Sequence, residues 1–136
     1  MIQRVQTIWL LLAAIAVFLT LKFSFYSGTL AKDNSFHSLV ATDHFLLMVL
    51  TSALGTAILV SIFLFKHRLV QFKLTIIALI VECIVLILYL RELKNYSQGT
   101  FDLWSIFHLV TVIMLILAAR GIYKDEKLVK DSNRLR

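Results

Sequence analysis

Four long apolar segments dominate the chain, at about residues 7–26, 44–65, 74–90 and 103–119. Each has about the length of a helix that crosses the hydrocarbon core of a bilayer, which takes roughly 20 residues. The chain has no proline, and only Gly55 among its four glycines falls inside a segment, so we expect straight helices. The pattern predicts an all-α membrane protein, an antiparallel four-helix transmembrane bundle over residues 1–119.

Small and polar residues recur at a period near 3.5 along one face of each segment. Along the third segment this stripe contains Thr75, Ala78, Glu82 and Tyr89, and it continues back to Gln71 in the preceding connection, while the other faces carry Leu, Ile and Val. Lipid cannot satisfy polar groups, so such a stripe points into a bundle. We therefore expect the four stripes to meet in a left-handed bundle.

Three connections and a tail complete the chain. Residues 27–43 and 91–102 are polar and read as surface loops, with Gly99 as the turn residue of the second. Residues 66–73 form a short basic turn. The charged tail, residues 120–136, is expected to continue the fourth helix into water.

The distribution of charge predicts the orientation in the membrane. Ten of the fourteen Lys and Arg residues fall on the side that holds both termini and the basic turn, which is typical of a cytoplasmic side. The first segment is longer than a cleavable signal sequence and reads as an uncleaved anchor. We therefore expect a multi-pass protein of the bacterial inner membrane with both termini cytoplasmic.

Composition narrows the functional classes. With 60% hydrophobic residues and a mean hydropathy of +0.86, the chain is too apolar for a soluble domain of 136 residues. Its net charge of +6 is explained by the basic residues on the predicted cytoplasmic side, so no specific binding of nucleic acid is expected. A single cysteine, Cys83, excludes an internal disulfide and two-thiol redox chemistry within one chain.

Glu82 is the one charged residue within residues 74–90, and it lies at the midpoint. An ionisable side chain at that depth is a candidate functional site. Five further side chains are predicted near its level and form with it an intramembrane polar cluster: Thr51, Ser52, Thr56, His108 and Thr111. The carboxyl could be a hydrogen-bonded lock that sets helix register, a proton-carrying or ligand-pairing group, or a contact with another membrane subunit.

The sequence gives little support for a cofactor, metal or catalytic site. His44 and His108 suggest bis-histidine haem, but their estimated depths differ. The chain has no zinc-spaced Cys/His cluster, phosphate-binding loop or nucleophile with a nearby base. We predict no cofactor, no metal and no enzymatic activity. The central glutamate resembles that of the small multidrug-resistance transporters by analogy only, because theirs is on the first helix in glycine-rich surroundings.

The cytoplasmic ends carry the remaining candidates. We predict that nine residues bind a partner or lipid headgroups: Arg4, Arg68, Gln71, Lys124, Asp125, Glu126, Lys127, Arg134 and Arg136. The basic tail would lie against anionic lipid or dock a cytoplasmic protein. RNA, a membrane partner and a second copy of the chain are further alternatives.

Three stretches of the chain carry a family resemblance. The opening MIQRVQTIWLLLAAIA, the basic turn FKHRLVQFKL and the ending LAARGIYKDEKLVKDSNRLR are similar to the start, middle and end of a domain-of-unknown-function family of small four-helix integral membrane proteins from Bacteroidetes. The resemblance covers essentially the whole chain. Two departures are His67, where the family more often has Asn or Lys, and Asn133, where an aspartate is expected. It implies an inner-membrane protein of uncharacterised function, and no catalytic residues carry over.

The sequence thus predicts a non-enzymatic accessory or scaffold subunit with a basic cytoplasmic docking face. The alternative is a small proton-coupled carrier that works through Glu82.

Overall fold

The computed structural model describes residues 2–134, with side chains from Val5 onward. Its four α-helices are α1 (Ile2–Thr20), α2 (Phe45–Phe63), α3 (Arg68–Glu92) and α4 (Ile106–Arg134). Three strands form one small sheet: β1 (Tyr26–Leu30), β2 (Phe36–Leu39) and β3 (Tyr96–Phe101). Four single 3₁₀ turns flank these elements: η1 (Ala41–Asp43), η2 (Leu64–Lys66), η3 (Leu93–Asn95) and η4 (Leu103–Ser105).

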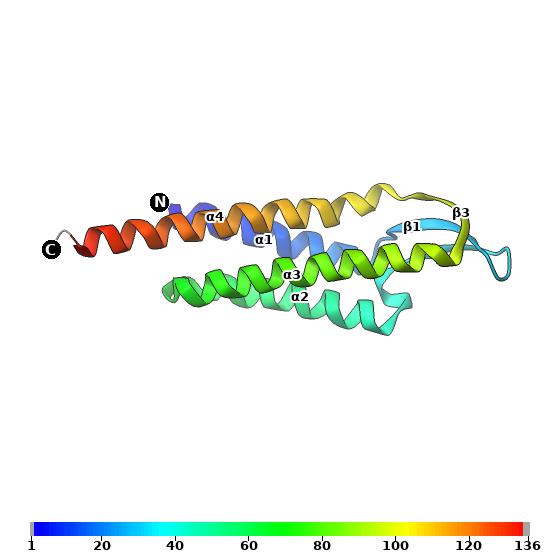
Figure 1. The fold of residues 1–136 in the computed structure, drawn as a ribbon, viewed down its shortest axis with the longest axis horizontal. Helices are drawn as coiled ribbons and strands as arrows, with labels where there is room; N and C mark the ends of the chain where they lie inside the picture. Colours follow the sequence, from blue (N-terminus) through cyan, green and yellow to red (C-terminus); the bar gives the residue numbers. More distant parts are fainter. Residues whose placement is uncertain (1, 135–136) are drawn as a thin grey trace.

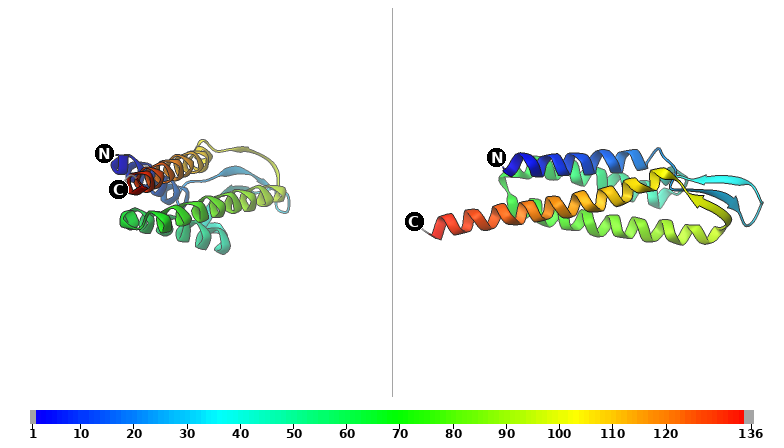
Figure 2. Two further views of the ribbon diagram at one scale, coloured as in Figure 1. Left: turned by 60° about the vertical axis from the view of Figure 1, so that its left-hand side comes forward. Right: turned by 90° about the horizontal axis from the view of Figure 1, so that it is seen from above.

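The helices form an elongated bundle (Figure 1). α1 packs against α2 and α4, and α3 packs against the same two helices. The sheet lies at one end of the bundle, which we call the sheet end; the start of α1 and the end of α4 lie at the other, the terminal end (Figure 1). There α4 extends past the turn between α2 and α3 (Figures 1 and 2).

Three helices, α2, α3 and α4, are long and apolar enough to cross a membrane. The apolar part of α1, Val5–Thr20, is shorter. The sequence predicted a first span over residues 7–26, but α1 ends at Thr20 and Tyr26 is the first residue of β1.

The buried face of α3 is the stripe predicted from the sequence, with Gln71, Thr75 and Glu82 among its members. The opposite face exposes Ile80 and Ile87, which are 54% and 63% exposed. Around the midpoint of α3, small and polar side chains therefore face the interior while large aliphatic ones cover the outside, the reverse of the usual arrangement in a water-soluble protein.

The sheet corrects two predictions and makes the all-α description incomplete. Residues 27–43 were expected to form a loop, but β1 and β2 form an antiparallel hairpin whose connection holds Asn34 at φ 50°. Residues 91–102 were also expected to form a loop, but β3 pairs with the other edge of β1, giving the order β2-β1-β3. Strand pairing satisfies backbone groups that these connections would otherwise leave to water.

Gly99 was predicted as a turn residue and instead lies within β3, directly opposite Gly28 of β1. The two backbones approach closely: a Cβ atom on Gly28 would lie 2.8 Å from the Cα of Gly99. Neither glycine has a positive φ. Both positions therefore require glycine for space and not for backbone conformation.

The interior contains two apolar clusters. Aromatic and aliphatic residues fill the sheet end, where the rings of Phe25 and Tyr89 stack with centroids 4.5 Å apart. Small and aliphatic residues such as Ala13, Ala78 and Ala118 fill the middle. Small side chains allow helices to pack closely, which is typical of helix contacts in a membrane.

We predict that Gly28→Val destabilises the protein by about 1–3 kcal/mol, since the new side chain must displace the backbone of β3. Thr100→Val, at an exposed position of β3 next to Gly99, is the matched control and should change the unfolding free energy little. Unfolding of the purified protein in detergent would measure both, and equal effects of the two valines would refute the close approach.

Candidate functional site

The most buried ionisable contact of the described chain joins α3 to α4. Oε1 of Glu82 lies 2.8 Å from Nδ1 of His108, and the two residues are only 1% and 2% exposed. A bond of that length needs one shared proton: either the imidazole N–H donates to a carboxylate, or a carboxylic acid donates to the ring nitrogen.

Aromatic rings close this pair on the side of the sheet. The ring of Tyr89 meets that of His108 edge-on at 5.0 Å, and the ring of Phe25 does so at 5.4 Å. Phe25 is held by its backbone N–H, which donates to the carbonyl of Leu39 at 2.8 Å. The hairpin therefore holds Phe25 against one side of the Glu82–His108 pair.

Two polar atoms beside the pair have no hydrogen-bond partner within the described residues, Oε2 of Glu82 and the hydroxyl of Tyr89. Leaving a buried polar group unpaired costs about 1–3 kcal/mol. A site that tolerates this cost can accept a proton or a hydrogen bond without first breaking another. The pair can thus hold or exchange a proton.

The other residues of the predicted polar cluster are split between buried and more exposed positions. Thr51 and Thr111 are fully buried, and Thr111 donates to the carbonyl of Phe107 in its own helix. Ser52 is half-buried and Thr56 is exposed, and each donates to a carbonyl of α2. Among the predicted members, His108 is the residue that the structure joins directly to Glu82.

A second polar contact lies near the terminal end and involves Asp125, which was predicted to bind a partner or lipid. Its side chain is 7% exposed and accepts a hydrogen bond of 2.7 Å from Nε2 of Gln6 in α1. Nη1 of Arg68 donates to the Asp125 carbonyl at 3.2 Å. These bonds tie α1 and α3 to α4, so Asp125 holds the bundle together.

The other predicted binding residues differ in accessibility. Gln71 is buried in the stripe of α3. Lys124, Lys127 and Arg134 are exposed on α4, and Glu126 pairs with Lys130 at 2.8 Å. The side chain of Arg4 and the whole of Arg136 lie outside the part of the chain that is described.

The two histidines considered for haem contact different acids. His44, at the start of α2, lies 3.6 Å from Glu92, whereas His108 pairs with Glu82. Within residues 2–134, no group of three or more His, Cys, Asp or Glu side chains is arranged to hold a metal ion.

Several residues that take part in these contacts could not be identified from sequence spacing. Gln6 and Asp125 are 119 residues apart, and Phe25 reaches His108 only because the hairpin folds back over the bundle. At the sheet end, Asp102 accepts hydrogen bonds from Ser24 and Ser27 and thereby joins the α1–β1 connection to the start of α4. The one local signal is the spacing of Gln6 from Leu10, Ala13 and Val17, which follow at intervals of three or four residues and are buried.

The fold and site thus define a helical protein with three potential membrane-spanning helices and a buried Glu–His pair. The chain belongs to the family described as a domain of unknown function, DUF4293, which matches residues 2–135. No curated protein and no solved structure matches it.

We predict that His108→Leu lowers the unfolding free energy by about 1–3 kcal/mol, because it leaves the buried Glu82 carboxyl without a partner. The double variant Glu82→Leu/His108→Leu should lose less than the two single variants combined. Unfolding in detergent with increasing denaturant would measure the coupling. His37→Leu, at an exposed position of β2, is the matched control, and additive effects would show that the pair contributes no coupling.

Proposed function

We propose that this is a multi-pass protein of the bacterial inner membrane with the terminal end of its bundle in the cytoplasm. The exposed Ile and Leu side chains on the outer faces of the helices support this placement, because lipid would cover them. Lys66, Arg68, Lys124 and Lys127 lie towards the terminal end, and such an excess of basic residues favours the cytoplasmic side.

Within the membrane we propose a non-enzymatic accessory or scaffold role, and the observation that carries it is the length of α4. Its 29 residues extend about 43 Å, more than the hydrocarbon core of about 30 Å. The end of α4 would thus stand in the cytoplasm as a rigid helix (Figure 1).

One face of this projecting helix is suited to binding a protein. Lys124, Lys127, Leu128 and Asp131 are exposed, and Leu128 is 56% exposed. These four residues, which we call the docking face, combine charge with an apolar side chain. A cytoplasmic partner would bury Leu128 and pair with the charges around it.

We predict that replacing the docking face (Lys124→Gln, Lys127→Gln, Leu128→Ser, Asp131→Asn) abolishes crosslinking of the protein to its partner in native membranes while leaving its fold intact. The measurement is crosslinking followed by mass spectrometry of the captured protein and reconstitution of the two purified components.

A control matched in residue type lies at the sheet end: Lys32→Gln, Lys94→Gln, Leu103→Ser and Asp33→Asn, all at exposed positions. It should leave crosslinking unchanged. Recovery of only the free monomer from unaltered membranes would contradict the scaffold role, and a crosslink that survives in the docking-face variant would place the partner elsewhere.

The alternative function, a proton-coupled small-molecule carrier, is favoured by one specific observation. Glu82 shares a proton with His108 through one carboxyl oxygen, while its other oxygen has no partner among the described residues. Such a carboxyl could exchange a proton for a cationic or hydrogen-bonding substrate.

This alternative predicts that Glu82→Gln abolishes proton flux in liposomes that contain the purified protein, because the amide cannot carry a proton. Glu92→Gln, at the end of the same helix, should leave the flux unchanged. A pH-sensitive dye inside the liposomes measures it. Absence of flux with the unaltered protein would reject the carrier.

A further inference from the structure

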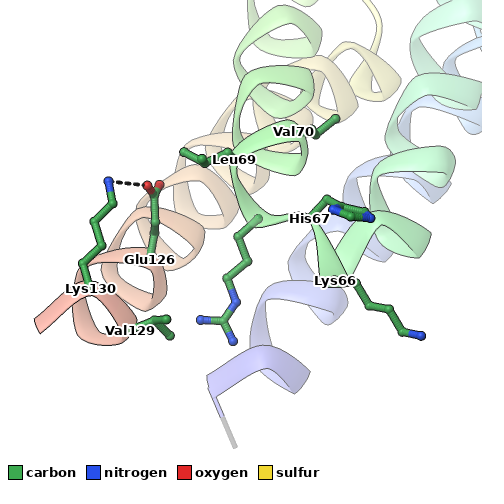
Figure 3. Close-up of a pocket in the computed structure, with 8 residues that line it drawn as sticks. Lys66, His67, Leu69, Val70, Glu126, Val129 and Lys130 are labelled. Carbon is green, nitrogen blue, oxygen red and sulfur yellow. Dashed lines mark ion pairs between the residues drawn. The ribbon is translucent and has the colours of Figure 1, made fainter. Parts of the chain in front are cut away.

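A cationic cleft opens at the terminal end between the α2–α3 turn and α4 (Figure 3). It encloses about 610 Å³, and Lys66, Arg68 and Lys130 supply positive charge to its lining. Glu126 is the one acidic residue that lines it, and it is paired with Lys130. The lining therefore carries a net positive charge, which favours an anionic ligand.

The Arg68 side chain is held in place at the cleft. Its Nη1 donates to the Asp125 carbonyl at 3.2 Å, so the guanidinium is fixed between α3 and α4. A guanidinium carries five N–H donors in a planar array, and this bond uses one nitrogen. The remaining donors suit the oxygens of a phosphate.

Apolar side chains accompany the cations. Leu69, Val70 and Val129 line the same cleft and are 56%, 51% and 44% exposed. A site for a free inorganic anion would not need them. Their presence indicates a ligand that is charged at one point and apolar beside it.

A second, apolar pocket of about 260 Å³ lies further along the contact between α3 and α4. Phe72, Ile76 and Leu79 line it from α3, and Ile116, Ala119, Arg120 and Tyr123 line it from α4. Arg120 is the one charged residue of this lining, and it is exposed.

The two pockets lie one after the other along the contact between α3 and α4. On α3, Leu69 of the cleft and Phe72, Ile76 and Leu79 of the apolar pocket are spaced three or four residues apart, so they share a helix face. On α4, Glu126 of the cleft lies three residues beyond Tyr123, which lines the apolar pocket. The rings of Phe72 and Tyr123 meet at 6.1 Å across the junction.

We propose that this combined groove binds an anionic phospholipid, with the phosphate in the cleft beside Arg68, attracted also by the charges of Lys66 and Lys130, and an acyl chain along Phe72, Ile76 and Ala119. The proposal rests on the membrane location given above, but not on the scaffold role. The groove and the docking face have no lining residue of α4 in common. The change from cationic to apolar lining along the groove matches the order of groups in a phospholipid.

The test compares lipids bound to the purified full chain in a neutral detergent, measured by native mass spectrometry. Phosphatidylglycerol is the anionic probe and phosphatidylcholine the zwitterionic one. We expect retention of one phosphatidylglycerol with an affinity about 25-fold or more above that of phosphatidylcholine, since each of two or three cations contributes about fivefold. Equal retention of the two lipids would overturn the proposal.

The variants separate a site from general attraction to charge. Lys66→Gln/Lys130→Gln should remove most of the preference for phosphatidylglycerol, whereas Lys32→Gln/Lys94→Gln, which removes the same charge at exposed positions of the sheet end, should retain it. Lys66→Gln alone should lose about fivefold in affinity, and Lys66 is exposed, so this variant should fold. An equal loss in both double variants would overturn the site.

The acyl half of the groove has its own pair of variants. Ile76→Trp should fill the apolar pocket and weaken phosphatidylglycerol binding, whereas Ile77→Trp, on the adjacent exposed face, should not. Displacement of the lipid by inorganic phosphate would show a phosphate site. Displacement by polyglutamate, together with no effect of Ile76→Trp, would show a protein site. Either result would overturn the proposal. Membrane fractionation tests the location separately, because all these comparisons are made in detergent.

Discussion

The hydrogen bond between Glu82 and His108 constrains how α3 and α4 can be arranged. The outer faces of these helices are apolar, so both side chains must find partners inside the bundle. A shift of one helix by a single residue would rotate one partner out of the seam by about 100°. The bond thus sets both the rotation and the longitudinal register of the two helices.

α4 also takes part in two further polar contacts between helices. Besides His108, it supplies Asp125, whose carboxylate binds Gln6 of α1 and whose carbonyl binds Arg68 of α3. Between these polar contacts the packing is built from small residues such as Ala13 and Ala118. Because α4 is held at His108 and at Asp125, its end leaves the bundle in a defined direction, which the proposed docking role requires.

The sheet end serves the buried pair as well as the connections. The hairpin brings Phe25 against Tyr89 and His108. Asp102, which precedes α4, accepts hydrogen bonds from Ser24 just before β1 and from Ser27 within it. The Glu–His pair is therefore covered from the sheet end by rings, while the cationic groove lies at the terminal end. Proton chemistry at the first site and ligand binding at the second would use separate ends of the bundle.

The sequence by itself determined the helical segments and their inward faces, because period and hydropathy are local properties of the chain. The stripe through Thr75 and Glu82 is buried as its spacing indicates. The ends of α1 and the strands were not predictable in this way, since β1 pairs with a strand about 70 residues away and the glycine pair has no local signal. Tertiary structure alone decided that Asp125 is buried, that Thr56 faces outward and that α3 and α4 together line two pockets. Each of these depends on which helices are neighbours and on their relative rotation, and neither is encoded in the pattern of a single segment.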